Sequence, residues 1–161
     1  MTSEPPRRVA AEVVGPGVRI SATLGADALT LERPVPLHVR IDLDPGLHVY
    51  RAPVPEGFVA TEVTVTGPEG LQVEAPVFPE AHPFRVAGIP HEFQVMGGNV
   101  EIEVPLSWTL PDNAPDAATE VPLDITVRYQ ACDDQQCFIP RVVALHLDVP
   151  VGRLYRATPP R

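Results

Sequence analysis

Short stretches of alternating hydrophobic and polar residues dominate the chain, each bounded by proline, glycine or other turn residues. Alternation with a period of two is the pattern of a β-strand that buries one face. The stretches expected to form strands are 9–14, 18–24, 35–43, 47–50, 62–66, 71–74, 100–110, 123–129 and 142–149, with 92–96 a weaker candidate. About nine short strands, spaced by ~8–12 residues with turn signals between them, predict an all-β sandwich or barrel.

The same pattern indicates one domain over residues 9–155, with a disordered leader at 1–8 and a flexible tail at 156–161. A chain of 161 residues is long enough to bury a core, and its 21 prolines and 11 glycines argue against long helices. Residues 75–90 carry four prolines and are expected to form a long loop. No apolar run approaches the ~18 residues of a membrane span, and the first residues lack the apolar centre of a signal peptide.

The net charge of the chain argues against one class of partner, the nucleic acids. The formal net charge is −9, and the twelve Lys and Arg residues are scattered. Nucleic-acid binding is therefore not expected, because neutralising phosphates requires clustered basic side chains. The compartment stays open at this point, between the cytoplasm and an extracytoplasmic location.

The only two cysteines, Cys132 and Cys137, lie four residues apart between two predicted strands. Strand, short polar loop and strand predict a β-hairpin, in which opposite Cα atoms lie close enough for a disulfide. The bridge could be a structural staple, or a redox pair at an exposed hairpin tip. A staple that closes so short a loop contributes only roughly 2 kcal/mol. Metal binding by the cysteines with His91 is the weaker third reading, since zinc sites normally use tighter cysteine pairs.

Acidic residues surround the pair. Asp133 and Asp134 follow Cys132 directly, and Arg141 is the nearest cation. Neighbouring carboxylates raise thiol pKa values, which opposes a permanently activated thiolate. The pair therefore suits exchange with a partner that supplies the reactive thiolate.

Several segments resemble a known family. The most specific is Tyr-Gln-Ala-Cys, four residues and Cys-Phe-Ile-Pro at 129–140, followed by the strand at 143–151. Weaker matches are Pro-Gly-Leu-His-Val-Tyr-Arg at 45–51, His-Glu-Phe at 91–93 and the strand at 100–107. Together they resemble the N-terminal domain of the thiol:disulfide interchange protein DsbD, over about residues 9–150.

The resemblance implies an immunoglobulin-like β-sandwich with a reversible Cys132–Cys137 disulfide. It further implies a periplasmic protein-disulfide reductase domain that relays electrons between a membrane-embedded thiol carrier and thioredoxin-fold partners. No flavin, haem or nicotinamide cofactor is implied, and a monomer is expected. The electron donor, the acceptor and the direction of flow stay open.

The resemblance also assigns roles to residues outside the cysteine loop. Phe93 would be an aromatic cap over the pair, Glu92 a nearby acid that influences proton transfer, and Tyr50 a residue lining the site. His48 stands where the family can have another aromatic. Cys137, at the hairpin exit, is the candidate for attacking the partner.

Two features depart from the family pattern. Gln136 is polar where an aromatic can precede the second cysteine, and glycines at 97–98 follow closely behind the expected cap.

The competing function is an immunoglobulin-like binding or accessory module with a structural disulfide.

Overall fold

The fold is all-β, as predicted, in a computed structural model that describes residues 9–13, 17–30, 33–109 and 120–151. The leader at 1–8 and the tail at 156–161 lie outside the described residues. The strands of the described part are β1 (Val9–Val13), β2 (Val18–Leu24), β3 (Val35–Leu43), β4 (His48–Tyr50), β5 (Glu62–Thr66), β6 (Leu71–Val73), β7 (His82–Arg85), β8 (Glu92–Gly97), β9 (Asn99–Trp108), β10 (Glu120–Tyr129), β11 (Ala131–Cys132) and β12 (Arg141–Pro150).

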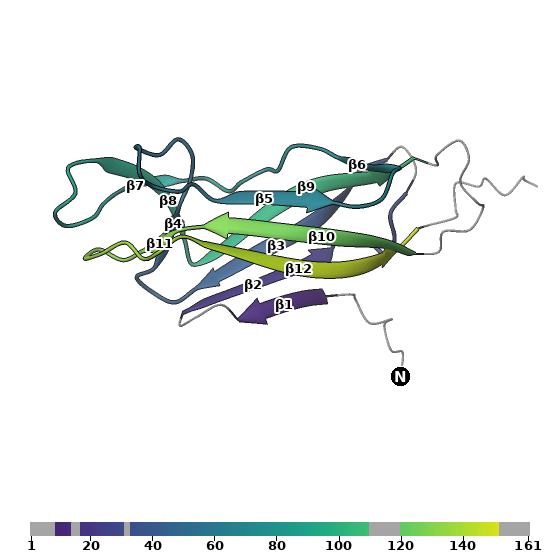
Figure 1. The fold of residues 1–161 in the computed structure, drawn as a ribbon, viewed down its shortest axis with the longest axis horizontal. Coiled ribbons are helices and arrows are strands. Elements are labelled where there is room, and N and C mark those ends of the chain that lie inside the picture. The colour runs from purple at the N-terminus through teal and green to yellow at the C-terminus, as the bar shows by residue number, and fades with distance from the viewer. Residues whose placement is uncertain (1–8, 14–16, 31–32, 110–119, 152–161) are drawn as a thin grey trace, which may run out of the picture.

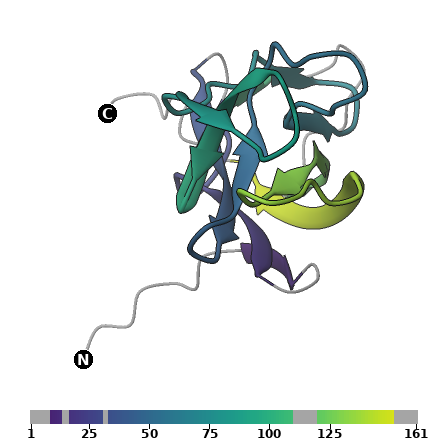
Figure 2. The same ribbon diagram turned by 90° about the vertical axis from the view of Figure 1, so that its left-hand side faces the viewer.

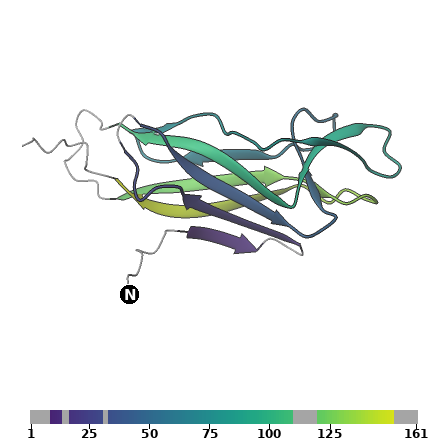
Figure 3. The same ribbon diagram turned by 180° about the vertical axis from the view of Figure 1, so that it is seen from behind.

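Two sheets face each other as an immunoglobulin-like sandwich (Figure 1). One has the order β1-β2-β3-β9-β6, and the other has the order β12-β10-β5. Every described pairing between named strands is antiparallel. Seen from behind, the five-stranded sheet lies in front of the three-stranded one (Figure 3).

The inner faces of the two sheets form the main core, and alternation selects which residues enter it. Along β9 and β10 every second side chain is buried, and the residues between them are mostly exposed. Burying branched apolar side chains on one face of each sheet supplies the hydrophobic driving force for this arrangement. Trp108 is 5% exposed and belongs to this core, as its position in an alternating strand predicts.

A third, smaller sheet lies at one end of the sandwich, with the order β11-β4-β8-β7. Figure 2 looks onto this end of the molecule. A turn at 44–46 connects β3 of the sandwich to β4 of this sheet. The Leu47 N–H donates to the Asp44 carbonyl at 3.1 Å, and Gly46 has a φ of +91°. Glycine adopts that φ without steric cost.

The long loop predicted for 75–90 is wrong in part, because β7 lies within it and pairs with β8. Three of the four β7 residues are exposed, so the strand shows none of the alternation that reveals a half-buried strand. Pro83 lacks a backbone N–H, which is tolerated because β7 is an edge strand. The other unpredicted strand, β11, is only two residues long.

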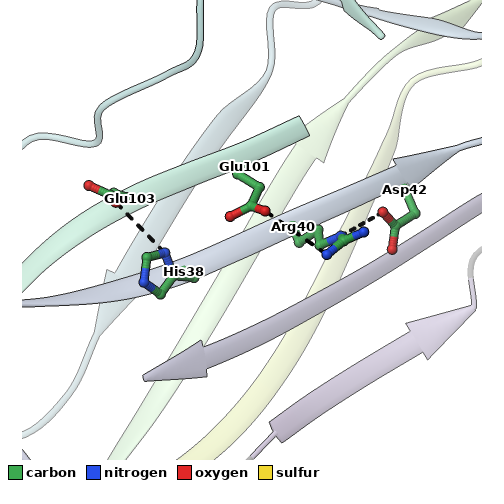
Figure 4. A network of polar contacts seen from close by, with 5 residues as sticks. All are labelled: His38, Arg40, Asp42, Glu101 and Glu103. Atoms are coloured by element: carbon green, nitrogen blue, oxygen red, sulfur yellow. Dashed lines mark hydrogen bonds and ion pairs between the residues drawn. The ribbon is translucent and has the colours of Figure 1, made fainter. Parts of the chain in front are cut away.

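The outer face of the five-stranded sheet carries charge pairs, both within β3 and between β3 and β9 (Figure 4). Arg40 of β3 contacts Asp42 at 2.7 Å and Glu101 of β9 at 3.9 Å. His38 lies 3.9 Å from Glu103 in the same pattern. These partly exposed pairs stabilise the fold little, but they make this face polar.

His146 of β12 lies between two aspartates on the outer face of the other sheet. Its Nδ1 is 3.0 Å from Asp124 and its Nε2 is 2.8 Å from Asp148. The hydrogen bonds to Asp124 and then Asp148 are the main causes of a raised His146 pKa. Because only the protonated ring donates through both nitrogens, the cationic form suits this site.

This geometry predicts a small pH dependence of stability. A raised folded-state pKa makes the stabilisation complete below the unfolded pKa of about 6.5 and lost as pH rises through the folded value. Urea midpoints of the native protein and His146→Gln should therefore differ most at pH 5.5 and converge at pH 9. A difference that grows with pH would contradict the assignment.

Candidate active site around Cys132 and Cys137

The predicted hairpin is confirmed, and both cysteines lie in its connection. β10 and β12 pair from Glu120 opposite Pro150 to Tyr129 opposite Arg141. Beyond that point the chain leaves the sandwich sheet, and β11 pairs with β4 in the small sheet, with Cys132 opposite His48. The connection therefore carries the cysteines from the sandwich into the small sheet.

Cys132 and Cys137 face each other as antiparallel bridge partners, and both are free thiols. The turn between them is fixed by Asp133, whose Oδ1 accepts the N–H groups of Gln135 and Gln136 at 2.8 Å each. The Asp133 N–H donates to the Gln136 carbonyl at 3.0 Å. Tight turns are commonly held by an aspartate whose carboxylate accepts hydrogen bonds from the backbone N–H groups two and three residues ahead.

The two cysteines differ in burial. Cys132 is fully buried, whereas Cys137 is half-buried. The expectation of an exposed hairpin tip is thus wrong for Cys132, because pairing with β4 turns its side chain into a second small core. That core consists of Tyr50, Val86, Phe93, Val95 and Cys132.

Three aromatic rings form the centre of this second core. Tyr50 and Phe93 stack with ring centroids 4.6 Å apart and an interplanar angle of 22°. Phe58 packs edge-on against Phe93 at 4.8 Å and against Tyr50 at 5.8 Å. Offset stacks and edge-to-face contacts are the favoured geometries of aromatic pairs. The rings therefore hold the Tyr50 side chain in one place.

The Tyr50 hydroxyl lies at the thiol pair. Its oxygen is 2.8 Å from the Cys137 sulfur, and hydrogen bonds to both thiols help raise the Tyr50 pKa, after burial as the largest cause. A phenol whose pKa is raised stays protonated at neutral pH and acts as a hydrogen-bond donor. The backbone of Tyr50 is also fixed, because the Thr61 N–H and hydroxyl both donate to its carbonyl, at 2.9 and 2.7 Å.

Burial dominates the ionisation of Cys132 and raises its pKa to about 11. The Tyr50 hydrogen bond opposes this by lowering the pKa, while Cys137 and Asp133 raise it further. The sequence-based prediction that acidic neighbours raise the thiol pKa holds for Asp133, although burial is the larger cause. Cys132 is therefore a protonated thiol at neutral pH in the reduced protein.

His48 faces Cys132 across the strand pair, but its ring packs against β7. The ring centroid lies 4.2 Å from that of Phe84 and 6.0 Å from that of His82. Its Nδ1 is buried without a hydrogen-bond partner, and burial, followed by His82, lowers the His48 pKa. His48 is therefore neutral at pH 7 and takes the place of an aromatic ring.

Glu92 is separated from the sulfurs. It is exposed at the start of β8, where it pairs with Arg85 of β7. Side chains of successive strand residues point to opposite faces, so Glu92 lies on the face opposite to Phe93. Of the six predicted site residues, the structure thus joins Tyr50, Phe93 and the two cysteines in one cluster, with His48 beside it.

Comparison with known proteins identifies the family of this chain. The family model described as thiol:disulfide interchange protein DsbD, N-terminal, matches residues 26–148. The chain belongs to this family. A comparison with curated protein sequences finds no match.

One of the solved structures that match this chain is similar to it in fold. The N-terminal periplasmic domain of ScsB from Proteus mirabilis shares 21% identity at a TM-score of 0.60, and the match covers 91% of this chain and 53% of that one. This chain thus spans about half the length of that relative. The reduced DsbD N-terminal domain of Neisseria meningitidis shares 14% identity at a TM-score of 0.48, over 89% of this chain and 84% of that one.

Sequence reasoning on this DsbD-type domain missed Gln130 as a structural residue. Gln130 is 6% exposed, its Nε2 donates to the Phe138 carbonyl at 3.0 Å, and its Oε1 accepts the Val59 N–H at 2.9 Å. It therefore joins both sides of the cysteine loop to the segment that carries Phe58. The only sequence signal for this role of Gln130 was a polar residue at a position where the strand would continue, within the Tyr-Gln-Ala motif.

A backbone contact also links the cysteine loop to the β7–β8 hairpin. The Ala87 N–H donates to the Asp134 carbonyl at 3.0 Å, and Val86 beside it is 2% exposed in the second core. The tip of this hairpin thus packs against the cysteine loop, with Val86 in the same small core as Cys132.

The described residues offer no support for the metal reading. Within them, no group of three or more His, Cys, Asp or Glu side chains is placed to hold a metal ion. Over the same residues, no helix has the length and apolar character needed to cross a bilayer.

Proposed function

We propose that this domain relays electrons between a membrane-embedded thiol carrier and thioredoxin-fold partners through a reversible Cys132–Cys137 disulfide. Membership of the DsbD N-terminal family makes it a thiol–disulfide interchange domain in general. The observation that carries the specific proposal is the pair itself. The two cysteines face each other across a fixed turn, and Cys137, the less buried one, is hydrogen-bonded to the hydroxyl of the buried Tyr50.

Cys137 is the cysteine that meets the partner, because it is the less buried of the two residues. When the domain is the reductant, the Cys137 thiolate attacks the partner disulfide, an S–S bond to the partner forms, and one partner sulfur leaves as a thiolate. Cys132 then attacks the Cys137 sulfur, which closes the intramolecular disulfide and releases the second partner sulfur. Two electrons pass to the partner, and the two cysteine protons go to the partner thiolates.

The Tyr50 hydroxyl assists the steps that involve the buried sulfur. With a Cys132 pKa of about 11, only on the order of 1 in 10⁴ of this thiol is ionised at pH 7. The Tyr50 hydrogen bond is the contact that favours the Cys132 thiolate. In this role Tyr50 donates a hydrogen bond to Cys132 both when it attacks and when it leaves.

The other predicted residues contribute less directly. Phe93 shields the pair by holding Tyr50 in place, which extends the predicted cap role. His48 supplies a neutral ring beside Cys132. Glu92 lies on the other face of β8, so its carboxylate influences proton transfer only through its charge at long range and not by contact with the thiols. We further propose a periplasmic, monomeric domain over residues 9–155, as the family resemblance implied, that needs no flavin, haem or nicotinamide.

A mixed-disulfide trap tests the proposal. Cys132→Ser, activated at Cys137 with thionitrobenzoate, is mixed with a thioredoxin that retains only its reactive cysteine. The thioredoxin thiolate should attack Cys137 and release thionitrobenzoate, leaving a covalent adduct on a non-reducing gel. The matched Cys137→Ser protein, whose remaining sulfur is fully buried, should form the adduct at least about tenfold more slowly.

The competing function, a binding module with a structural disulfide, gives a different outcome. The reduction potential of the native pair would then lie well below about −300 mV, whether or not the activated variants form the adduct. An adduct formed equally fast by both variants would reject Cys137 as the attacking residue while retaining the exchange function.

A further inference from the structure

Three exposed hydrophobic residues follow Cys137 closely in the sequence. Among the described residues, the large hydrophobic side chains that are exposed are Val73 (41%), Val77 (57%), Phe138 (41%), Ile139 (81%) and Val142 (65%). The last three lie within five residues of Cys137 and are called here the apolar strip. Monomeric proteins expose single hydrophobic side chains routinely, but a group of them beside a reactive atom indicates a contact surface.

The backbone of the strip is held in place before any partner arrives. The Phe138 N–H donates to the Ala131 carbonyl at 2.9 Å, and the Phe138 carbonyl accepts the Gln130 Nε2 at 3.0 Å. Val142 lies within β12, opposite Arg128. A surface that is already ordered loses little conformational entropy on binding, which favours association.

The chemistry at Cys137 brings the backbone of a partner within reach of this strip. A mixed disulfide holds the two Cα atoms ~4.4–6.8 Å apart, and consecutive Cα atoms along the chain are ~3.8 Å apart. Any protein bonded to Cys137 therefore has its own backbone close to Phe138 and Ile139. The other side of Cys137 is different, since Asp134, Gln135 and Gln136 are exposed polar residues.

We propose that the apolar strip is the docking surface for the apolar face beside the reactive cysteine of a thioredoxin-fold partner. The inference rests on the proposed function and adds the residues that select the partner. Ile139, the most exposed of the three, is the main contact. The polar turn at 134–136 lies at the edge of the interface, where polar residues normally surround an apolar centre.

The test compares a protein partner with a small one. Rate constants are measured for the reduced full-length chain reacting with oxidised thioredoxin and with oxidised glutathione. Ile139→Ser should lower the rate with thioredoxin about tenfold and leave the rate with glutathione within about twofold. Ile139→Leu, which keeps an apolar side chain, should retain the thioredoxin rate. Val77→Ser, an exposed valine in an isolated bridge to β9, should change neither rate.

Three results would overturn the docking surface. An unchanged thioredoxin rate in Ile139→Ser shows that the strip is not used, and an equal fall with both oxidants shows altered cysteine reactivity instead. A native dimer that Ile139→Ser converts to a monomer in sedimentation shows that a second copy covers the strip. Failure of the proposed function is distinct, because the native pair would then have the low reduction potential of a structural disulfide, whatever the effect of Ile139→Ser on the rates.

Discussion

Replacing Phe93 with alanine is expected to lower the unfolding free energy of the reduced protein by about 3–5 kcal/mol. Phe93 is 1% exposed and contacts Tyr50 and Phe58 in the second core, so the substitution removes a buried ring and leaves a cavity. Urea unfolding followed by Trp108 fluorescence measures the change. Phe138→Ala is the matched control, because its ring is 41% exposed and should cost less than about 1 kcal/mol.

The same experiment separates a cap from a core residue. If Phe93 were a loose lid over the sulfurs, its removal would speed alkylation of Cys132 and hardly change stability. In the structure Phe93 is instead packed within the small core. Phe93→Ala should therefore lower the free energy of unfolding and, in the same protein, increase the alkylation rate of Cys132. A loss of less than about 1 kcal/mol would contradict this packing role.

The sandwich was predictable from sequence because its strands bury one face and expose the other. Strands β9 and β10 alternate over ten residues, and the turn at 44–46 contains the proline and glycine that its geometry requires. Strand β7 lies at an edge and is mostly exposed, so no alternation marks it. Strand β11 is too short to carry any periodic signal and is defined by its pairing with β4.

The candidate site was predictable only in part. The cysteine pair stands out by spacing, and the resemblance pointed to Tyr50 and Phe93, which the structure places in one cluster. Phe58 contacts Phe93, 35 residues further along the chain, and Gln130 bonds Val59 across 71 residues, and no local pattern encodes such tertiary contacts. The different access of the two sulfurs likewise follows from the third sheet, which the sequence did not reveal.

Replacing Tyr50 with phenylalanine is expected to slow reduction of the Cys132–Cys137 disulfide by dithiothreitol about 10–100-fold. In this reaction a dithiothreitol thiolate attacks the accessible Cys137 sulfur, and Cys132 leaves as a buried thiolate. A thiol of higher pKa is a poorer leaving group. Burial already raises the pKa of Cys132 to about 11, and the Tyr50 hydroxyl is the group that lowers it.

The expected factor follows from the strength of the lost contact. A hydrogen bond to a charged group contributes about 1.5–3 kcal/mol, which corresponds to a rate change of roughly 10–100-fold. Tyr129→Phe is the matched control, because it removes a hydroxyl from a buried tyrosine of the main core and should leave the rate within about twofold. Because the ring stack with Phe93 does not need the hydroxyl, Tyr50→Phe should keep near-native stability. A Tyr50→Phe rate within twofold of the native rate would show that Cys132 leaves without help from the phenol.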